Sequence, residues 1–205
     1  MMLEVISPEL ANYHQQKLSD YQRANQRDPK EAIVFTGDSI IEFFPLKKFL
    51  GRDRLILNRG IAGTDTQWLK EHLKDQVLAV EPDKLFILIG TNDLGFGFDD
   101  KHILGNLRQI LATVQIESIA TKVYLMSILP VSQKEAYQDR VKLRRNSVIQ
   151  ALNDQLEELH LAEFIDLYPY LLDEDGHLAD VYTTDGLHLS QEGYAVMAER
   201  LRLYL

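Results

Sequence analysis

Short apolar runs alternate with helix-like patterns along most of the chain, and this alternation constrains the fold more than any other feature of the sequence. Each run is rich in β-branched or aromatic residues and is typical of a strand buried on both faces. This order of elements predicts a parallel sheet with helices on both faces and right-handed connections. The runs span residues 32–36, 55–58, 84–89, 122–127 and 163–167.

Apolar residues at three- and four-residue steps mark the expected helices. One helix starts near residue 68, after residues 64–67 (TDTQ), which fit a capping box. The others are predicted over residues 8–26, 103–114 after Asp99 and Asp100, 141–159, and 194–205 after Ser190. We expect a single domain over residues 1–205, with the helix and linker of residues 1–30 packed on it.

The composition excludes several classes of function. The net charge of -9 opposes binding to nucleic acid, because a phosphate backbone is bound by clustered Lys and Arg. The chain has no cysteine, so disulfides and a cysteine nucleophile are excluded. No stretch reaches the roughly 18 apolar residues of a membrane helix, and no signal-peptide pattern opens the chain. We therefore expect a cytoplasmic protein without a membrane span.

Polar, glycine-containing turns follow the first three predicted strands. They are residues 37–40 (GDSI), 58–63 (NRGIAG) and 90–93 (GTND). Each turn alone is explained by the turn preference of Gly, Asp, Asn and Ser. Ligands of parallel α/β sheets, however, bind beyond the carboxyl ends of the strands. We therefore expect these turns to converge on a binding site.

Asp185 and His188 lie in a loop just before the last predicted helix, separated by a glycine turn. A neutral imidazole accepts a serine proton only when its other nitrogen is held as an N–H donor, and a nearby carboxylate does this. Ser39 suits the nucleophile because it follows a buried strand and opens the short apolar segment 40–44. The alternative is that Ser39 only caps this helix.

Acyl transfer also needs hydrogen-bond donors for the developing oxyanion. The candidates are the N–H groups of Ser39 and Gly60 and the side-chain amide of Asn92. Gly60 also fits a plain turn glycine, and Asn92 also fits a residue that closes a turn. Asp38 and Asp93 are expected to hold the turns by hydrogen bonds.

The choice of base among six histidines rests on position. His188 is favoured because its loop leads into a capped helix that packs on the sheet. His177 is the competitor, with acidic residues nearby in a polar surface stretch. The remaining histidines fall in predicted helices away from strand ends, namely His14, His72, His102 and His160.

With these motifs the sequence resembles the GDSL esterases, also called SGNH hydrolases. The matching residues are Ser39 in GDS, Gly60 in NRG, Asn92 in GTND, and Asp185 with His188 in DGLH. The motifs lie in the family's order between residues 36 and 189, with GDSI replacing GDSL. The resemblance implies a flavodoxin-like three-layer α/β/α fold with strand order 2-1-3-4-5 and hydrolysis of esters or thioesters without a metal or cofactor.

Within this family the chain looks most similar to the catalytic subunits of platelet-activating factor acetylhydrolase and to bacterial acylhydrolases. That branch implies short acyl groups such as acetyl, a small-molecule ester as the partner, and a homodimer. The predicted function is thus a serine esterase in which Ser39, His188 and Asp185 form a catalytic triad and an acyl-enzyme forms on Ser39.

Two other functions fit part of the pattern. In a metal-dependent phosphoesterase, the aspartates of these motifs and His188 would be metal ligands, but no basic residue or glycine-rich phosphate loop accompanies them. In a non-catalytic flavodoxin-like binding module, Asp38 would be an acceptor and Ser39 incidental. This second alternative leaves the pair of Asp185 and His188 without a role.

Overall fold

A computed structural model describes residues 3–205, so the first two residues of the predicted domain lie outside it. Its core is one parallel sheet in the order β2-β1-β3-β4-β5, as expected for the three-layer fold. The predicted strands are confirmed to within about two residues at each end. They are β1 Ile33–Gly37, β2 Ile56–Gly60, β3 Lys84–Leu88, β4 Lys122–Met126 and β5 Glu163–Ile165.

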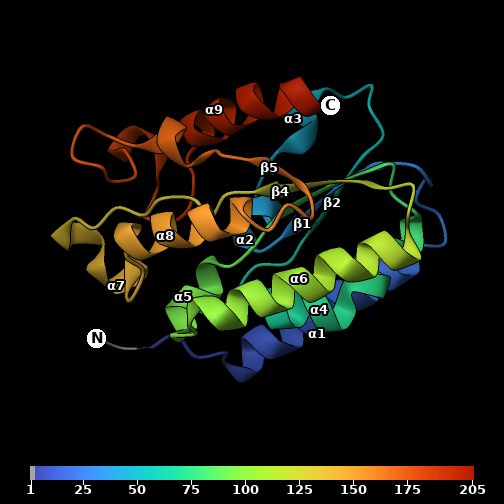
Figure 1. The fold of residues 1–205 in the computed structure, drawn as a ribbon, viewed down its shortest axis with the longest axis horizontal. Coiled ribbons are helices and arrows are strands. Elements are labelled where there is room, and N and C mark those ends of the chain that lie inside the picture. The colour runs from blue at the N-terminus through green and yellow to red at the C-terminus, as the bar shows by residue number, and fades with distance from the viewer. Residues whose placement is uncertain (1–2) are drawn as a thin grey trace.

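Helices cover both faces of this sheet (Figure 1). In Figure 1, α1, α4 and α6 lie below the sheet, whereas α3 and α9 lie above it. The α-helices are α1 Pro8–Ala24, α2 Ser39–Glu42, α3 Leu46–Leu50, α4 Thr66–Gln76, α5 Thr91–Phe96, α6 Asp100–Glu117, α7 Gln138–Val141, α8 Asn146–Glu157 and α9 Gln191–Leu201. In residues 3–205, no helix is both long enough and apolar enough to cross a membrane.

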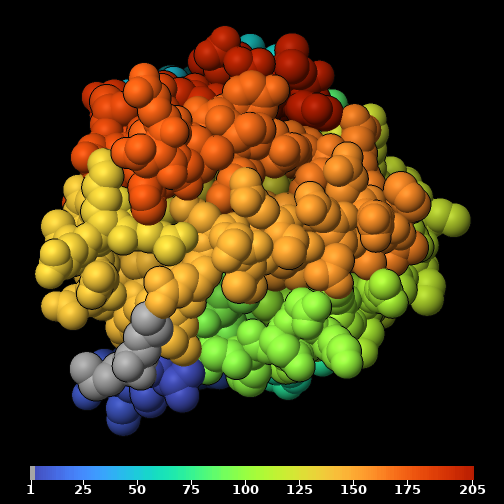
Figure 2. Space-filling view, turned by 60° about the vertical axis from the view of Figure 1, so that its left-hand side comes forward, coloured from blue at the N-terminus to red at the C-terminus, as the bar shows by residue number. Residues whose placement is uncertain are grey.

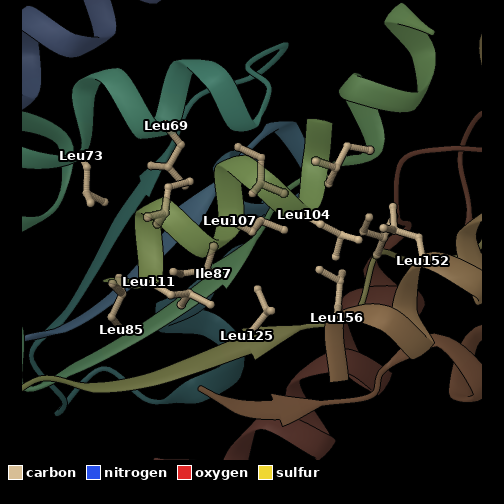
Figure 3. Close-up of a cluster of buried hydrophobic side chains, with 14 of the residues drawn as sticks. Leu69, Leu73, Leu85, Ile87, Leu104, Leu107, Leu111, Leu125, Leu152 and Leu156 are labelled. Carbon is tan, nitrogen blue, oxygen red and sulfur yellow. The ribbon is translucent and has the colours of Figure 1, made fainter. Parts of the chain in front are cut away.

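Alternation along the buried strands divides the core into two clusters, one on each face of the sheet. Leu85 and Ile87 of β3 point into the first cluster, which α4, α6 and α8 cover with leucines (Figure 3). Phe86 and Leu88 of the same strand point into the second, which α9 covers. In the second cluster the rings of Phe86 and Phe35 stack with their centroids 4.5 Å apart.

The strand register brings the predicted turns to one edge of the sheet. Gly37 at the end of β1 pairs with Gly60 of β2 and with Leu88 of β3. Three polar turns therefore leave the sheet at the same level. Close approach makes Gly37 necessary, because a Cβ there would lie 1.8 Å from the Leu88 carbonyl oxygen.

The predicted helix over residues 141–159 is shorter than expected. It forms only as α8, while Val141 ends α7. Lys142 between them has φ 55° and ψ −115°, a conformation outside the helical region that breaks the pattern. The capping box also shifts by one residue, since Asp65 caps α4 by accepting the Trp68 N–H. Ser190 and Asp99 cap α9 and α6 as expected.

Two glycine substitutions test this packing. We expect Gly37→Ala to lower the free energy of unfolding by at least about 3 kcal/mol, because the new methyl group meets backbone atoms that cannot rotate away. Gly105→Ala is the matched control, since a Cβ there meets nothing within 4 Å. In the interior of α6 it should stabilise the protein by up to about 1 kcal/mol. Urea unfolding measures both, and equal effects of the two substitutions would contradict the packing described.

Candidate active site

Ser39, His188 and Asp185 form one hydrogen-bonded line at the carboxyl edge of the sheet. The Ser39 hydroxyl lies 2.9 Å from His188 Nε2, although the two residues are 149 positions apart. His188 Nδ1 lies 2.8 Å from Asp185 Oδ2. A carboxylate that holds the Nδ1–H leaves Nε2 as the acceptor for a hydroxyl proton. The arrangement is that of a nucleophile, its base and the group that orients the base.

Asp185 is held as a carboxylate by its own loop. Its Oδ1 accepts the N–H groups of Leu187 and His188 at 3.1 and 2.8 Å. The Nε of Arg140 lies 3.0 Å from its Oδ2. Burial alone would raise the pKa of Asp185, but the hydrogen bonds from His188 and the loop outweigh it and hold this pKa below its ordinary value. Asp185 is therefore ionised at neutral pH and fixes the orientation of the imidazole.

Ser39 is the first residue of α2, and the residue before it caps that helix. The side chain of Asp38 accepts the Ile40 N–H at 2.9 Å, so the interpretation of Ser39 as an N-cap is wrong. The Ser39 hydroxyl is thereby left for His188. Its own N–H donates no hydrogen bond within residues 3–205, because the first N–H groups of a helix have no intrahelical partner.

The loop after β2 places Gly63, and not Gly60, at the cavity. The Gly60 N–H donates to Asn58 Oδ1 at 3.0 Å, and a Cβ on Gly60 would lie 2.3 Å from the Glu42 nitrogen. Gly60 thus packs under α2, away from the cavity lining. Gly63 lines the cavity beside Ser39 with φ +81°, and its N–H has no acceptor among the described residues.

Asn92 presents its amide to the same cavity. Its Nδ2 donates one hydrogen to the Thr64 carbonyl at 2.8 Å, which leaves its second hydrogen for a ligand. Its Oδ1 accepts from Arg144 Nη2 at 3.1 Å, so the oxygen faces away from the ligand. Asn92 follows Thr91 in the first turn of α5 and is 6% exposed.

Arg144 is buried and carries the most connected guanidinium of the site. Its Nη1 and Nη2 bind Glu4 Oε1 and Oε2 at 3.0 and 2.7 Å in a bidentate pair. Its Nε donates to the Thr91 carbonyl at 2.8 Å. Gly95 leaves room for this pair, since a Cβ there would lie 2.3 Å from Glu4 Oε2. The residues before α1 are therefore tied to α5 through one arginine.

The loop of Gly63 is fixed from both sides by polar contacts. Glu42 Oε2 accepts the Ala62 N–H at 2.6 Å, and Glu42 Oε1 lies 2.9 Å from Lys17 Nζ. His14 Nε2 lies 2.9 Å from the Ala62 carbonyl. The expectation that His14 lies away from strand ends is thus wrong, because α1 packs against this loop. Burial lowers the pKa of His14, which keeps the ring neutral.

A cavity of about 330 Å³ opens above Ser39 and His188. Apolar side chains from four parts of the chain form its walls, and charged side chains stand at its rim. The apolar ones are Val5, Leu10, Phe43, Phe96 and Leu187, and the charged ones are Glu4, Arg140 and Lys142. Phe43 also packs against the imidazole of His188, with ring centroids 5.8 Å apart.

The two remaining predicted residues, Asp38 and Asp93, are fully buried and tie turns together. Asp93 accepts the Thr66 N–H at 3.0 Å and also the Thr66 hydroxyl, which joins the third turn to the start of α4. Burial raises the pKa of Asp93 to about 7 and that of Asp38 to about 6. Asp38 Oδ2 has no hydrogen-bond partner among the described residues.

The residues of the two alternatives, His177 as the base and a metal site of a phosphoesterase, do not form a comparable cluster. His177 Nδ1 accepts the Gln133 N–H at 3.0 Å, in the loop outside the cavity lining. Within residues 3–205, no group of three or more His, Asp or Glu side chains has the geometry of a metal site. Of the ligands expected for a phosphoesterase, Asp38 and Asp93 bind backbone N–H groups and Thr66, whereas Asp185 and His188 bind each other.

The sequence motifs missed Gly63, Arg144 and the contribution of α1. Gly63 stands three residues after Gly60 in the same NRGIAG segment. The sequence contained a signal for Gly63, because a second glycine shortly after a strand indicates a turn with positive φ. Arg144 and Glu4 carry no such signal, because they meet across 140 positions of sequence.

Asp93 generates a test by pH. An unfolded Asp titrates near about 3.9, so between about pH 4 and 7 the folded chain holds more protons than the unfolded chain. The free energy of unfolding should therefore fall as pH rises through this window, by up to about 1.4 kcal/mol per pH unit. We expect Asp93→Asn to remove this term, so its stability relative to the natural chain should increase towards pH 7. Urea unfolding across this window checks it, and a pH-independent difference would contradict it.

Comparisons with known proteins identify the family of this chain. The model of the GDSL-like Lipase/Acylhydrolase family matches residues 35–196. An N-acylneuraminate cytidylyltransferase of Escherichia coli is 31% identical over 88% of the chain, which spans 42% of that protein's length. The human platelet-activating factor acetylhydrolase IB subunit alpha1 is 25% identical over 89% of the chain and 78% of its own length.

A solved structure from Streptococcus pneumonia, provisionally described as a platelet activating factor, is 37% identical. It superposes with a TM-score of 0.92 over 96% of this chain and 94% of that chain. The fold, the order of the motifs and the matched residues lead to the same conclusion. The chain belongs to the GDSL-like lipase/acylhydrolase family, a family of carboxylic ester hydrolases.

Proposed function

We propose that this chain, acting as one domain, hydrolyses carboxylic esters of short acyl groups through a covalent acyl-enzyme on Ser39. The observation that carries the proposal is the continuous line of hydrogen bonds from Ser39 through His188 to Asp185. A serine hydroxyl is a weak nucleophile at its own pKa, and an adjacent oriented base is what activates it.

In the first step His188 Nε2 takes the Ser39 proton as Oγ attacks the ester carbonyl. Asp185 stabilises the imidazolium that forms, because it is already ionised. The carbonyl oxygen becomes negative and accepts hydrogen bonds from the free N–H groups of Ser39 and Gly63 and from Asn92 Nδ2. Such donors act at a position where charge develops, and each is worth roughly 3 kcal/mol of transition-state stabilisation.

The second half of the reaction uses the same residues. His188 gives its proton to the leaving alcohol, and the acyl group stays on Ser39 Oγ. A water molecule then loses a proton to His188 and attacks the acyl carbon, which frees the acid and restores Ser39. Gly63 replaces Gly60 as the proposed oxyanion donor, because the Gly60 N–H already donates to Asn58 Oδ1.

The size of the cavity supports a short acyl group. At about 330 Å³ it lies near the lower end of the roughly 300–1,000 Å³ of small-molecule sites. Leu10 closes the side next to Gly63, where its methyl groups lie 2.9 and 3.0 Å from an ideal Cβ position on that glycine.

Removal of the base tests the triad. We expect His188→Ala to lower kcat/KM for a chromogenic acetate ester by roughly 10²–10⁴ fold, because Ser39 loses its proton acceptor. Covalent labelling of Ser39 by a fluorophosphonate should fall with it. His177→Ala is the matched control, since His177 lies outside the cavity and should leave turnover unchanged. Full activity of His188→Ala, with labelling of Ser39 retained, would refute the proposal.

Asn92 and Arg144 form a second test. Asn92→Ala should lower kcat by roughly 10²–10³ fold, as loss of an oxyanion donor does. We expect Arg144→Met to lower kcat in the natural chain, because the Asn92 amide loses its orientation. The same substitution should add almost nothing on top of Asn92→Ala.

Arg59→Met controls for the loss of a buried arginine. Arg59 is also 1% exposed, but it pairs with Asp28 and Asn25 beneath α1. The Arg59→Met substitution should lower thermal stability and leave kcat nearly unchanged. If Arg144→Met reduced kcat equally in both Asn92 backgrounds, Arg144 would not act through Asn92.

A further inference from the structure

Residues 140–145 (RVKLRR) contain four of the 22 basic residues of a chain whose net charge is -9. This basic segment links α7 to α8 at the rim of the catalytic cavity. Arg140 and Lys142 line that cavity together with Ser39 and His188. A concentration of positive charge beside the nucleophile of an acidic protein is not required by ester chemistry, since an uncharged ester needs no cation.

The basic segment is held in place by its buried arginine. Arg144 is anchored by Glu4 and Thr91, as described above. Figure 2 shows the blue N-terminal residues against the gold part of the chain around residue 140. Lys142, two residues before this anchor, has φ +55°, a backbone conformation that costs energy for any side chain with a Cβ. Strain of this kind is typical of positions that a site uses.

Both cations keep hydrogen-bond donors for a ligand. Arg140 places Nε 3.0 Å from Asp185 and is 59% exposed, and its Nη groups make no hydrogen bond within residues 3–205. Lys142 Nζ approaches Glu4 Oε1 only to 3.9 Å, beyond hydrogen-bond distance. Glu4 itself is already bound at both oxygens by Arg144, and Asp185 is bound by His188. Asp185 and Glu4 therefore leave hydrogen-bond donors of Arg140 and Lys142 available for a ligand.

Lys142 also lines a second cavity, of about 360 Å³. Most of its lining residues are of polar type, among them Ser132, which is fully buried and whose hydroxyl has no hydrogen-bond partner among the described residues. Asp139 is its one acidic lining residue in the described chain, against the cations of the basic segment. Lys142 is thus shared by the catalytic cavity and a second cavity whose lining residues are mostly polar.

We propose that Arg140 and Lys142 bind an anionic group, a carboxylate or a phosphate, on the alcohol part of the substrate. This inference rests on the proposed function and names its substrate class. We place the anionic group on the alcohol part because Arg140 contacts Asp185, the partner of the base that protonates the leaving oxygen. The second cavity receives the remainder of the alcohol.

Three phenyl acetates that differ only at the para position test the proposal. One carries a carboxylate, one a phosphate, and one a neutral carboxamide. The quantity measured is the ratio of kcat/KM for each anionic ester to that for the carboxamide. We expect this ratio to fall about tenfold or more in Lys142→Gln and in Arg140→Gln, as loss of a charged hydrogen bond predicts. Added salt should lower it in the natural chain.

Two further variants separate binding from folding. Lys142→Gly relieves the positive φ and removes the charge, so thermal stability should stay the same or rise while the anionic ratio falls. Lys74→Gln removes an exposed lysine of α4, far from the cavity lining, and should leave the ratio unchanged. A purely structural role for Lys142 predicts the reverse, with stability altered and the ratio unchanged.

The outcomes distinguish the two proposals. A fall in the ratio for the carboxylate, the phosphate or both supports the anionic substrate class and identifies the preferred group. If the natural chain hydrolyses all three esters and the ratios are the same in Lys142→Gln and Arg140→Gln, the basic segment does not bind the substrate. If the natural chain hydrolyses none of them and Ser39 is not labelled by a fluorophosphonate, the proposed ester hydrolysis itself is wrong.

Discussion

The parallel pairing of β1 with both β2 and β3 is the constraint on which the rest of the structure depends. Because the pairing is in register, Gly37 ends level with Gly60 and Leu88, and the chain must leave the sheet at one edge three times. The close approach of Gly37 to β3 brings Ser39 directly over this edge. His188 reaches it from the far end of the chain, since its loop precedes the helix that covers the second core cluster.

Polar contacts convert this converging edge into a defined cavity. Each turn contains backbone N–H groups that need hydrogen-bond acceptors, and acidic side chains accept from them. Glu42 takes the Ala62 N–H, Asp93 takes the Thr66 N–H, and Asp38 takes the Ile40 N–H. The raised pKa values of the two buried aspartates show the electrostatic cost of this arrangement. In exchange the turns are rigid. Rigid turns suit acyl transfer, because hydrogen-bond donors to an oxyanion stabilise it best when they do not move during the reaction.

The alternation of elements predicted the sheet, and the motifs predicted which turns meet. This worked because buried strands and their turn residues are local signals. Gly60 was misplaced as a cavity residue because a motif does not show which of two glycines points outward, whereas the Asn58 side chain occupies the Gly60 N–H. The partnership of Arg144 with Glu4 and Asn92 depends on tertiary packing alone. No periodicity in residues 140–145 distinguishes a buried arginine from an exposed one.

The break between α7 and α8 explains why the expected long helix would have been a poorer solution. In a helix that continued from α7 into α8, Arg140 and Lys142 would project roughly 160° apart, so only one of them would face the cavity. The positive φ of Lys142 turns the chain, and both side chains then line the same space while Arg144 points into the core. The bidentate pair of Arg144 with Glu4 offsets the backbone strain at Lys142. The buried arginine that binds Asn92 Oδ1 therefore also holds the segment that carries the two cations.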